Sequence, residues 1–220
     1  MSEWAASDVD WQTDSILPNP PKGAVPVLHD REYRVESFFL ENGNLLINGA
    51  LRDQKPPGLF VPDDPEPLTM HHMQVGLEIS LPDRTIIAVH THFEAYPHSG
   101  CPSIIDHYSS LVGLSIARGF THKVRELFGG PRGCSHTTAL LQAMAPIAMQ
   151  SSKSIEAIQA ERNGKPNPIV VRPADQGKNW EYLLNTCHVW AEGGVSHSAI
   201  DEGGMQTIPV DVRLNDLGLD

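Results

Sequence analysis

Two residues in the middle of the chain, Cys134 and His136, have side chains that could do chemistry. They lie in the segment Gly133-Cys134-Ser135-His136, which follows Gly129-Gly130-Pro131 and opens a stretch with helical periodicity. Cys134 therefore falls at the expected helix N-cap, where unpaired backbone N–H groups and the helix dipole favour a thiolate. A thiolate at this position could act as a nucleophile, a metal ligand or a proton carrier.

Three residues at the ends of predicted elements could bind a metal ion together. His71 begins a predicted strand, Cys101 follows the next strand, and His136 shares its helix face with the apolar Leu140. Zinc and ferrous iron accept both cysteine sulfur and histidine nitrogen, and three protein ligands leave a position for water or substrate. We therefore expect one divalent metal, zinc or iron, bound by His71, Cys101 and His136. The alternative for a single inward histidine is an ordinary core residue.

Asp53 and Lys55 close the first predicted hairpin, just before Pro56. If the loop folds over the site, a charged group there could serve as acid, base or substrate anchor, and we expect Asp53 to be catalytic together with Cys134. A solvated turn is the alternative. His90 and His92 share one face of a strand, and an exposed polar strand face explains them better than a second metal site.

Two hairpins are predicted to position these residues. Apolar residues alternate from Tyr33 to Leu51 around an Asn42-Gly43 turn. A proline-rich loop follows at 55–67, and alternation resumes over 73–79 and 85–93 with a turn at Pro82-Asp83. The pattern predicts an antiparallel sheet of about four strands.

The second half of the chain changes to helical periodicity. Helices are expected at about 102–114, 120–128 and 134–150, and Pro146 should kink the last one near its end. A sheet followed by about three helices is typical of the α+β class. Beyond Asn163, short β-like runs such as 169–171 and 187–190 are expected to return to the sheet edge.

These patterns divide the chain into three parts. Residues 1–30 contain four prolines after position 17 and read as an extended or disordered arm. Residues 31–163 form the predicted α+β core domain, and residues 164–220 form a C-terminal extension packed on it. The arm, the proline-rich loop and the extension, which carries Trp180, Tyr182 and Trp190, could wall a pocket for a small, partly apolar or aromatic molecule.

Composition narrows the range of partners and compartments. A formal net charge of −11 without a basic cluster argues against nucleic acid, and no apolar run is long enough to cross a bilayer. We expect a cytoplasmic protein that does not contact a membrane, with its oligomeric state left open. Three scattered cysteines favour free thiols or metal ligands over disulfides.

The order of motifs resembles an uncharacterised bacterial family, a domain of unknown function with the usual signature Arg-Gly-Cys-Thr-His-Leu. The resemblance spans roughly Arg31 to Trp190 and is most specific at 129–136, GGPRGCSH. The family usually has His-Asp-Met where this chain has His71-His72-Met73, and Thr-His-Leu where it has Ser135-His136-Thr137. Further shared motifs are Cys101-Pro102, Val112-Gly113-Leu114 and Thr186-Cys187-His188.

The predicted element order is also similar to that of iron-sulfur scaffold proteins of the NifU and IscU type. Those proteins run from strands through a cysteine and two helices to a Cys/His pair that opens the last helix. The resemblance implies that His71 lies near an acidic ligand of the scaffold site, Cys101 at a cysteine ligand, and Cys134 or His136 at the last two ligands.

Together these features predict a metal-dependent enzyme for a small-molecule substrate. The metal would act as a Lewis acid on a substrate oxygen, which suits a lyase of the retro-aldol or elimination type, or alternatively a hydrolase. A metal or iron-sulfur carrier is a further alternative, although histidine outnumbers thiolate among the predicted ligands. A binding domain without a metal is the third hypothesis.

Overall fold

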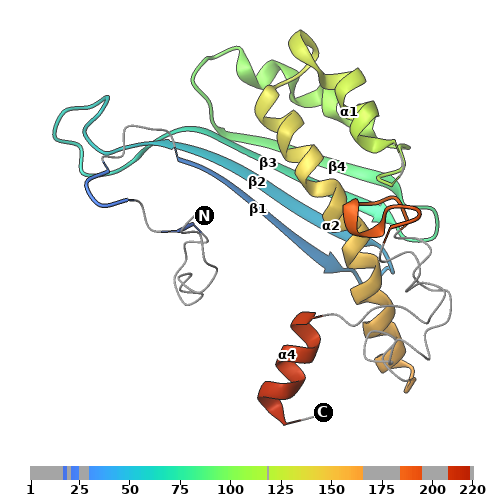
Figure 1. Cartoon of the computed structure of the whole chain (residues 1–220). Coiled ribbons are helices and arrows are strands. Elements are labelled where there is room, and N and C mark those ends of the chain that lie inside the picture. Colours follow the sequence, from blue (N-terminus) through green and yellow to red (C-terminus); the bar gives the residue numbers. More distant parts are fainter. Residues whose placement is uncertain are drawn as a thin grey trace.

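A computed structural model describes residues 17–18, 21–24, 30–117, 119–165, 184–194 and 208–218. Its sheet is antiparallel with the strand order β1-β2-β3-β4 (Figure 1). The strands are β1 (Asp30–Phe39), β2 (Leu45–Lys55), β3 (Leu68–Ser80) and β4 (Thr85–Ala95). Helical segments follow: η2 (Cys101–Leu111), α1 (Phe120–Phe128), η3 (Gly130–Arg132), α2 (Ser135–Arg162), η6 (His188–Trp190) and α4 (Ile208–Leu217). The predicted α+β fold is confirmed.

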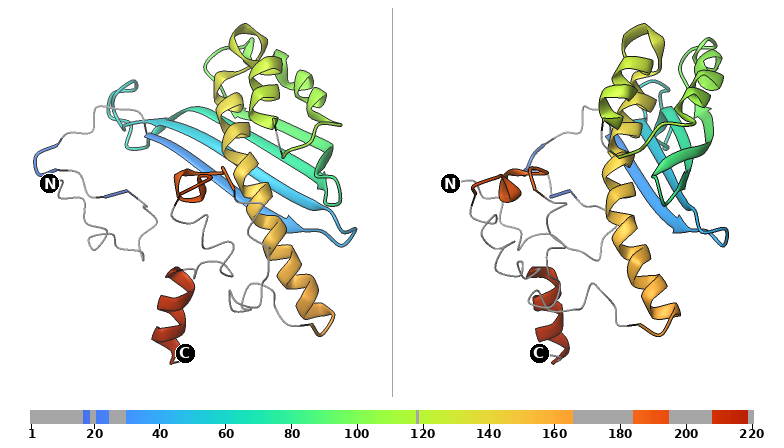
Figure 2. Two further views of the ribbon diagram at one scale, coloured as in Figure 1. Left: turned by 45° about the vertical axis from the view of Figure 1, so that its right-hand side comes forward. Right: turned by 90° about the vertical axis from the view of Figure 1, so that its right-hand side faces the viewer.

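One face of the sheet forms the core. Burial alternates along β2 and β3, as expected for strands with one covered face. Helix α2 lies over this face and contacts β1, β2 and β3, and α1 packs beside it (Figure 2). The inward side chains of the two central strands are Leu45, Ile47, Leu51, Asp53, Met73, Val75, Leu77 and Ile79.

The predicted hairpin turns are present. Gly43 has φ +85°, a left-handed conformation that glycine adopts without a steric cost. Around it the Leu40 N–H donates to the Asn44 carbonyl oxygen at 2.9 Å. The long loop 56–67 joins β2 to β3. Asp53 and His71 lie near its two ends and pair with each other across the two strands.

The segment predicted as a helix at 102–114 is instead a run of 3-10 turns that ends at Leu111. Serine hydroxyls stabilise this tighter winding because they bond carbonyl oxygens three residues back. Ser103 Oγ donates to Gly100 O, and Ser110 Oγ donates to His107 O at 2.7 Å. The segment contacts β4 and closes that side of the core.

Helix α2 continues to Arg162, well beyond the predicted end near residue 150. Pro146 lies near its middle, and the residues after it are mostly good helix formers. Tertiary contact also supports the second half, where Ser151 Oγ lies 2.8 Å from Ser37 Oγ on β1. The helix therefore runs over the sheet from the end of β2 to the start of β2. It then extends past the sheet (Figure 1).

The other face of the sheet is polar. Arg52 pairs with Glu32 at 2.8 Å, and His72 pairs with Glu94 at 2.9 Å. His90 and His92 are exposed on the same face, as predicted. Among the described helices, none has the length and apolar character that a bilayer crossing requires.

Most of the predicted arm at 1–30 and of the extension at 164–220, including 169–171, Trp180 and Tyr182, lies outside the described residues. The prediction of a β-like run at 187–190 is wrong, because His188–Trp190 is a 3-10 turn. It is closed locally: the Trp190 N–H donates to Cys187 O, and the Asn185 N–H donates to Trp190 O at 2.8 Å.

Gly49 allows α2 to lie close to the sheet, and its replacement provides the first prediction. A Cβ at this position would lie 2.7 Å from Met144 Sδ and 2.9 Å from its Cγ. We expect Gly49→Val to lower the free energy of unfolding by about 1–3 kcal/mol through overpacking, as measured by urea denaturation. Gly100→Ala, which places a Cβ in open space, is the control. A change below about 0.5 kcal/mol for Gly49→Val would contradict this packing.

Candidate functional site

Three strands place polar side chains at one end of the buried sheet face. Asp53, near the end of β2, pairs with Arg31 on β1 and with His71 on β3. The register shifts at this point, because Gln54 pairs with Thr69, so Met70 is an extra residue that interrupts the regular pairing. The N-terminus of α2 lies over the same end and brings His136 to Asp53.

These side chains converge on one carboxylate oxygen. Asp53 is 0% exposed, and its Oδ2 lies 3.1 Å from His71 Nδ1 and 3.2 Å from His136 Nε2. The two imidazole rings stack with centroids 3.8 Å apart and an interplanar angle of 27°. One ligand atom from each of the three residues lies within 4.8 Å of the other two. A carboxylate and two imidazoles in this arrangement can bind a cation or share protons.

Arg31 orients the carboxylate from the other side. Its Nε donates to Asp53 Oδ1 at 2.6 Å, and its Nη2 donates to Oδ2 at 2.7 Å. The bidentate fork fixes the plane of the carboxylate, and the bonds to Asp53 raise the pKa of Arg31 above its ordinary value. The guanidinium therefore stays charged, and the buried Asp53 has a permanent counter-ion.

Cys134 lies behind His136 at the N-cap of α2, as predicted. Its sulfur makes no capping bond with the helix and instead lies 3.7 Å from His136 Nδ1. The Cys134 N–H donates to Tyr108 Oη at 2.9 Å, which anchors the segment to η2. Burial raises the pKa of Tyr108, although its bonds with the Cys134 N–H and Thr137 oppose the shift, so the phenol is neutral at pH 7.

The structure brings together four of the five predicted site residues: Asp53, His71, Cys134 and His136. Cys101 does not belong to the candidate group found among the described residues; it opens η2, half-buried, and packs against the hydrophobic core. In the candidate group Asp53 stands where the sequence-based set had Cys101. The role of each residue stays a prediction.

Arg31 was missed by sequence reasoning. The Asn42-Gly43 turn sets the register of the first hairpin, and that register pairs Arg31 with Asp53. Counting outward from the turn in the sequence would have placed the two opposite charges face to face. Their pairing was the available signal that Asp53 has a counter-ion on β1.

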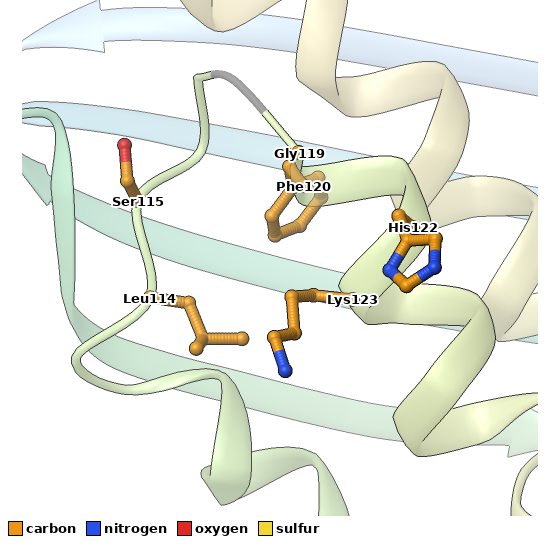
Figure 3. Close-up of a pocket in the computed structure, with 6 residues that line it drawn as sticks. All are labelled: Leu114, Ser115, Gly119, Phe120, His122 and Lys123. Carbon is orange, nitrogen blue, oxygen red and sulfur yellow. The ribbon is translucent and has the colours of Figure 1, made fainter.

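A separate hollow lies at the start of α1, between α1 and the segment that precedes it (Figure 3). It measures about 310 Å³ and is lined by Leu114, Ser115, Gly119, Phe120, His122 and Lys123. Ser115 bridges Thr85 at the start of β4, so the hollow lies at the end of the sheet opposite Asp53. It contributes nothing to the cluster.

Fold and site define an α+β domain in which one long helix covers an antiparallel sheet and adds a histidine to an Asp-His-His cluster whose carboxylate is buried and whose imidazoles are partly exposed. The chain belongs to the family described as "Protein of unknown function (DUF2889)", whose match spans residues 29–150. That span contains Arg31, Asp53, His71, Cys134 and His136. The expected membership in a family of unknown function is confirmed over residues 29–150, and the Arg-Gly-Cys signature stays a prediction. No curated protein and no solved structure matches the chain, so the similarity to NifU and IscU scaffolds stays a prediction.

The Arg31–Asp53 pair gives an asymmetric stability prediction for the chelator-treated chain. Arg31→Met leaves a fully buried carboxylate without its cation and should cost on the order of 3 kcal/mol. Asp53→Asn leaves a guanidinium that is 35% exposed and can turn to water, so it should cost only about 1 kcal/mol. Urea denaturation above the pH range where histidine titrates measures both. Equal costs, or a larger cost for Asp53→Asn, would contradict the arrangement.

Proposed function

We propose that this protein is a metal-dependent enzyme whose single divalent ion is bound by Asp53, His71 and His136. The observation that carries the proposal is the convergence of two imidazole nitrogens on one oxygen of a fully buried carboxylate, at 3.1 and 3.2 Å. Two histidines and one carboxylate form a recurrent ligand set for catalytic zinc and for non-haem ferrous iron. The ligand set supports either metal.

The spacing of the donor atoms suits a small cation. Nitrogen and oxygen ligands about 2.1 Å from a tetrahedral ion lie about 3.4 Å from one another. The two measured separations, 3.1 and 3.2 Å, differ from that value by only a few tenths of an ångström. Small side-chain rotations would therefore admit an ion without moving the strands.

Neighbouring groups support this ligand set. Metal-binding histidines commonly use their second ring nitrogen to contact a residue that fixes the ring orientation. With Nε2 of His136 directed at the ion, Nδ1 faces Cys134 Sγ at 3.7 Å. Arg31 likewise fixes the orientation of the Asp53 carboxylate, by donating from Nε to Oδ1. Cys134 thus acts next to the proposed metal rather than on it, in keeping with the proton-carrying role predicted from the sequence.

A metal at this position would supply Lewis acidity for a substrate oxygen. We propose a lyase reaction of the retro-aldol or elimination type on a small, partly apolar or aromatic molecule, with hydrolysis on the same centre as the alternative reaction. Arg31 and Cys134 would orient the ligands, and Cys134 would move protons. An iron-sulfur carrier is less well supported, because the candidate group in the described residues contains no cysteine.

A second candidate function uses the same residues without a metal. Cys134 Sγ, His136 Nδ1 and Nε2, and Asp53 Oδ2 form a continuous series with gaps of 3.7 and 3.2 Å. A thiol, an imidazole and a carboxylate in this order are the elements of a nucleophilic relay. This candidate would make the protein a thiol-dependent acyl-transfer enzyme or hydrolase.

Metal affinity of the full chain tests the proposed centre. We expect one Co²⁺ or Zn²⁺ per chain, and we expect His71→Ala and His136→Ala each to weaken binding by at least about 100-fold, because each removes a ligand. Isothermal titration calorimetry gives the affinities. His72→Ala is the matched control, since His72 is the neighbour of His71 but pairs with Glu94 on the opposite face.

Cys101→Ser separates the two ligand sets in the same titration. The structural set predicts unchanged affinity for this variant, whereas the sequence-based set predicts a loss as large as that of His136→Ala. Full metal content in both His71→Ala and His136→Ala would refute the centre altogether.

The relay makes a different prediction about thiol reactivity. In a Cys101→Ser, Cys187→Ser background, only Cys134 remains for alkylation by iodoacetamide. The relay predicts that His136→Ala slows this alkylation by about tenfold in the chelator-treated chain, because the imidazole no longer accepts the thiol proton. Mass spectrometry follows the reaction, and His72→Ala again serves as the control. An unchanged rate in His136→Ala would exclude the relay.

A further inference from the structure

On the face covered by α2, the end of the sheet that holds the cluster carries two cationic side chains, Arg31 and Lys55, and one carboxylate, Asp53. Asp53 is the one carboxylate of the candidate group, and Arg31 neutralises it. Lys55 lies two residues further along β2, half-buried and on the same face as Asp53 by strand alternation. Among the described residues Lys55 has no ion-pair partner. A divalent ion adds to this surplus, although the whole chain has a net charge of −11.

Arg31 keeps hydrogen-bond donors that Asp53 does not use. A guanidinium carries five N–H donors, and the pair with Asp53 engages Nε and Nη2 only. Nη1 is directed away from the carboxylate, on a side chain that is 35% exposed. Tyr33 is a further polar partner of the guanidinium, and the two bonds to Asp53 and this contact still leave N–H donors over. A guanidinium with such donors beside a cation is well suited to bind a carboxylate.

The surface beside these donors is open and partly aromatic. Tyr33 follows Arg31 on the same face of β1 and is 42% exposed, because α2 covers this edge strand less completely than it covers β2. The side chains of His71 and His136 are 17% and 19% exposed, so the cluster is accessible to a ligand. A ring lying against Tyr33 would place a substituent near Arg31.

We propose that the substrate of this site is a carboxylate with an aromatic or apolar body, and that Arg31 and Lys55 recognise its negative charge while Tyr33 contacts the body. The inference rests on the proposed metal centre and adds the substrate class to it. A neutral molecule of the same shape would leave the positive charge of the site without a counter-ion. Charge therefore dominates the choice of substrate.

Binding of benzoate to the Co²⁺-loaded full chain tests this inference, with benzyl alcohol as the neutral probe of similar size. We expect benzoate to change the visible Co²⁺ spectrum in a saturable way and to bind at least about tenfold more tightly than benzyl alcohol. Arg31→Lys retains a cation for Asp53 but loses the planar fork, and it should weaken benzoate binding by about tenfold. Arg52→Lys, on the opposite face of β2, is the matched control and should change nothing.

The outcomes separate this inference from the proposed function. If Co²⁺ produces no bound spectrum before any benzoate is added, the metal centre fails and this inference fails with it. If Co²⁺ binds but the two probes bind equally, or Arg31→Lys leaves benzoate affinity unchanged, only the substrate class is refuted. Should Arg31→Lys not fold or not hold Co²⁺, Lys55→Gln decides, with an expected weakening of about threefold. An unchanged benzoate affinity in that variant refutes the inference.

Discussion

The fully buried carboxylate of Asp53 is the constraint on which this end of the molecule depends. A carboxylate removed from water costs several kcal/mol unless charges and hydrogen-bond donors surround it. Here Arg31 supplies a bidentate counter-ion, and His71 and His136 direct nitrogens at the same oxygen. Three strands and the first turn of α2 must therefore meet at one point. The packing of α2 against Gly49 holds the helix near enough to the sheet to do this.

The sequence was informative where local rules decide the outcome. The glycine turn at Gly43, the alternation along β2 and β3, and the break before Ser135 predicted four strands and two of the helices. The prediction from the sequence fails where tertiary contacts override the local conformational preference of the residues. Helix α2 continues past Pro146, and its second half is bonded to β1 through Ser151 and Ser37. In η2, bonds from serine hydroxyls to carbonyl oxygens tighten the backbone into 3-10 turns. Neither the continuation of α2 nor the 3-10 winding of η2 follows from hydrophobic periodicity alone.

The candidate site also combines residues that local sequence rules predict with residues that only tertiary contacts place. His71, Cys134 and His136 were identified because their types and their positions at element ends are visible in the sequence. Cys101 was grouped with them because it also opens an element, yet it packs against the hydrophobic core outside the candidate group of the described residues. Asp53 was expected to be catalytic, with a solvated turn as the alternative. Its burial follows from the alternation along β2, which puts it on the inward face with Leu51, and Arg31 supplies its counter-ion from β1.

The central claim is that Asp53, His71 and His136 bind one metal ion without a sulfur ligand. X-ray absorption spectroscopy of the zinc-loaded full chain measures the ligands directly. This ligand set predicts only nitrogen and oxygen neighbours, at about 2.0–2.2 Å, with the outer-shell scattering of two imidazoles. A sulfur neighbour at about 2.3 Å, or a chain that binds no zinc at this site, would contradict it.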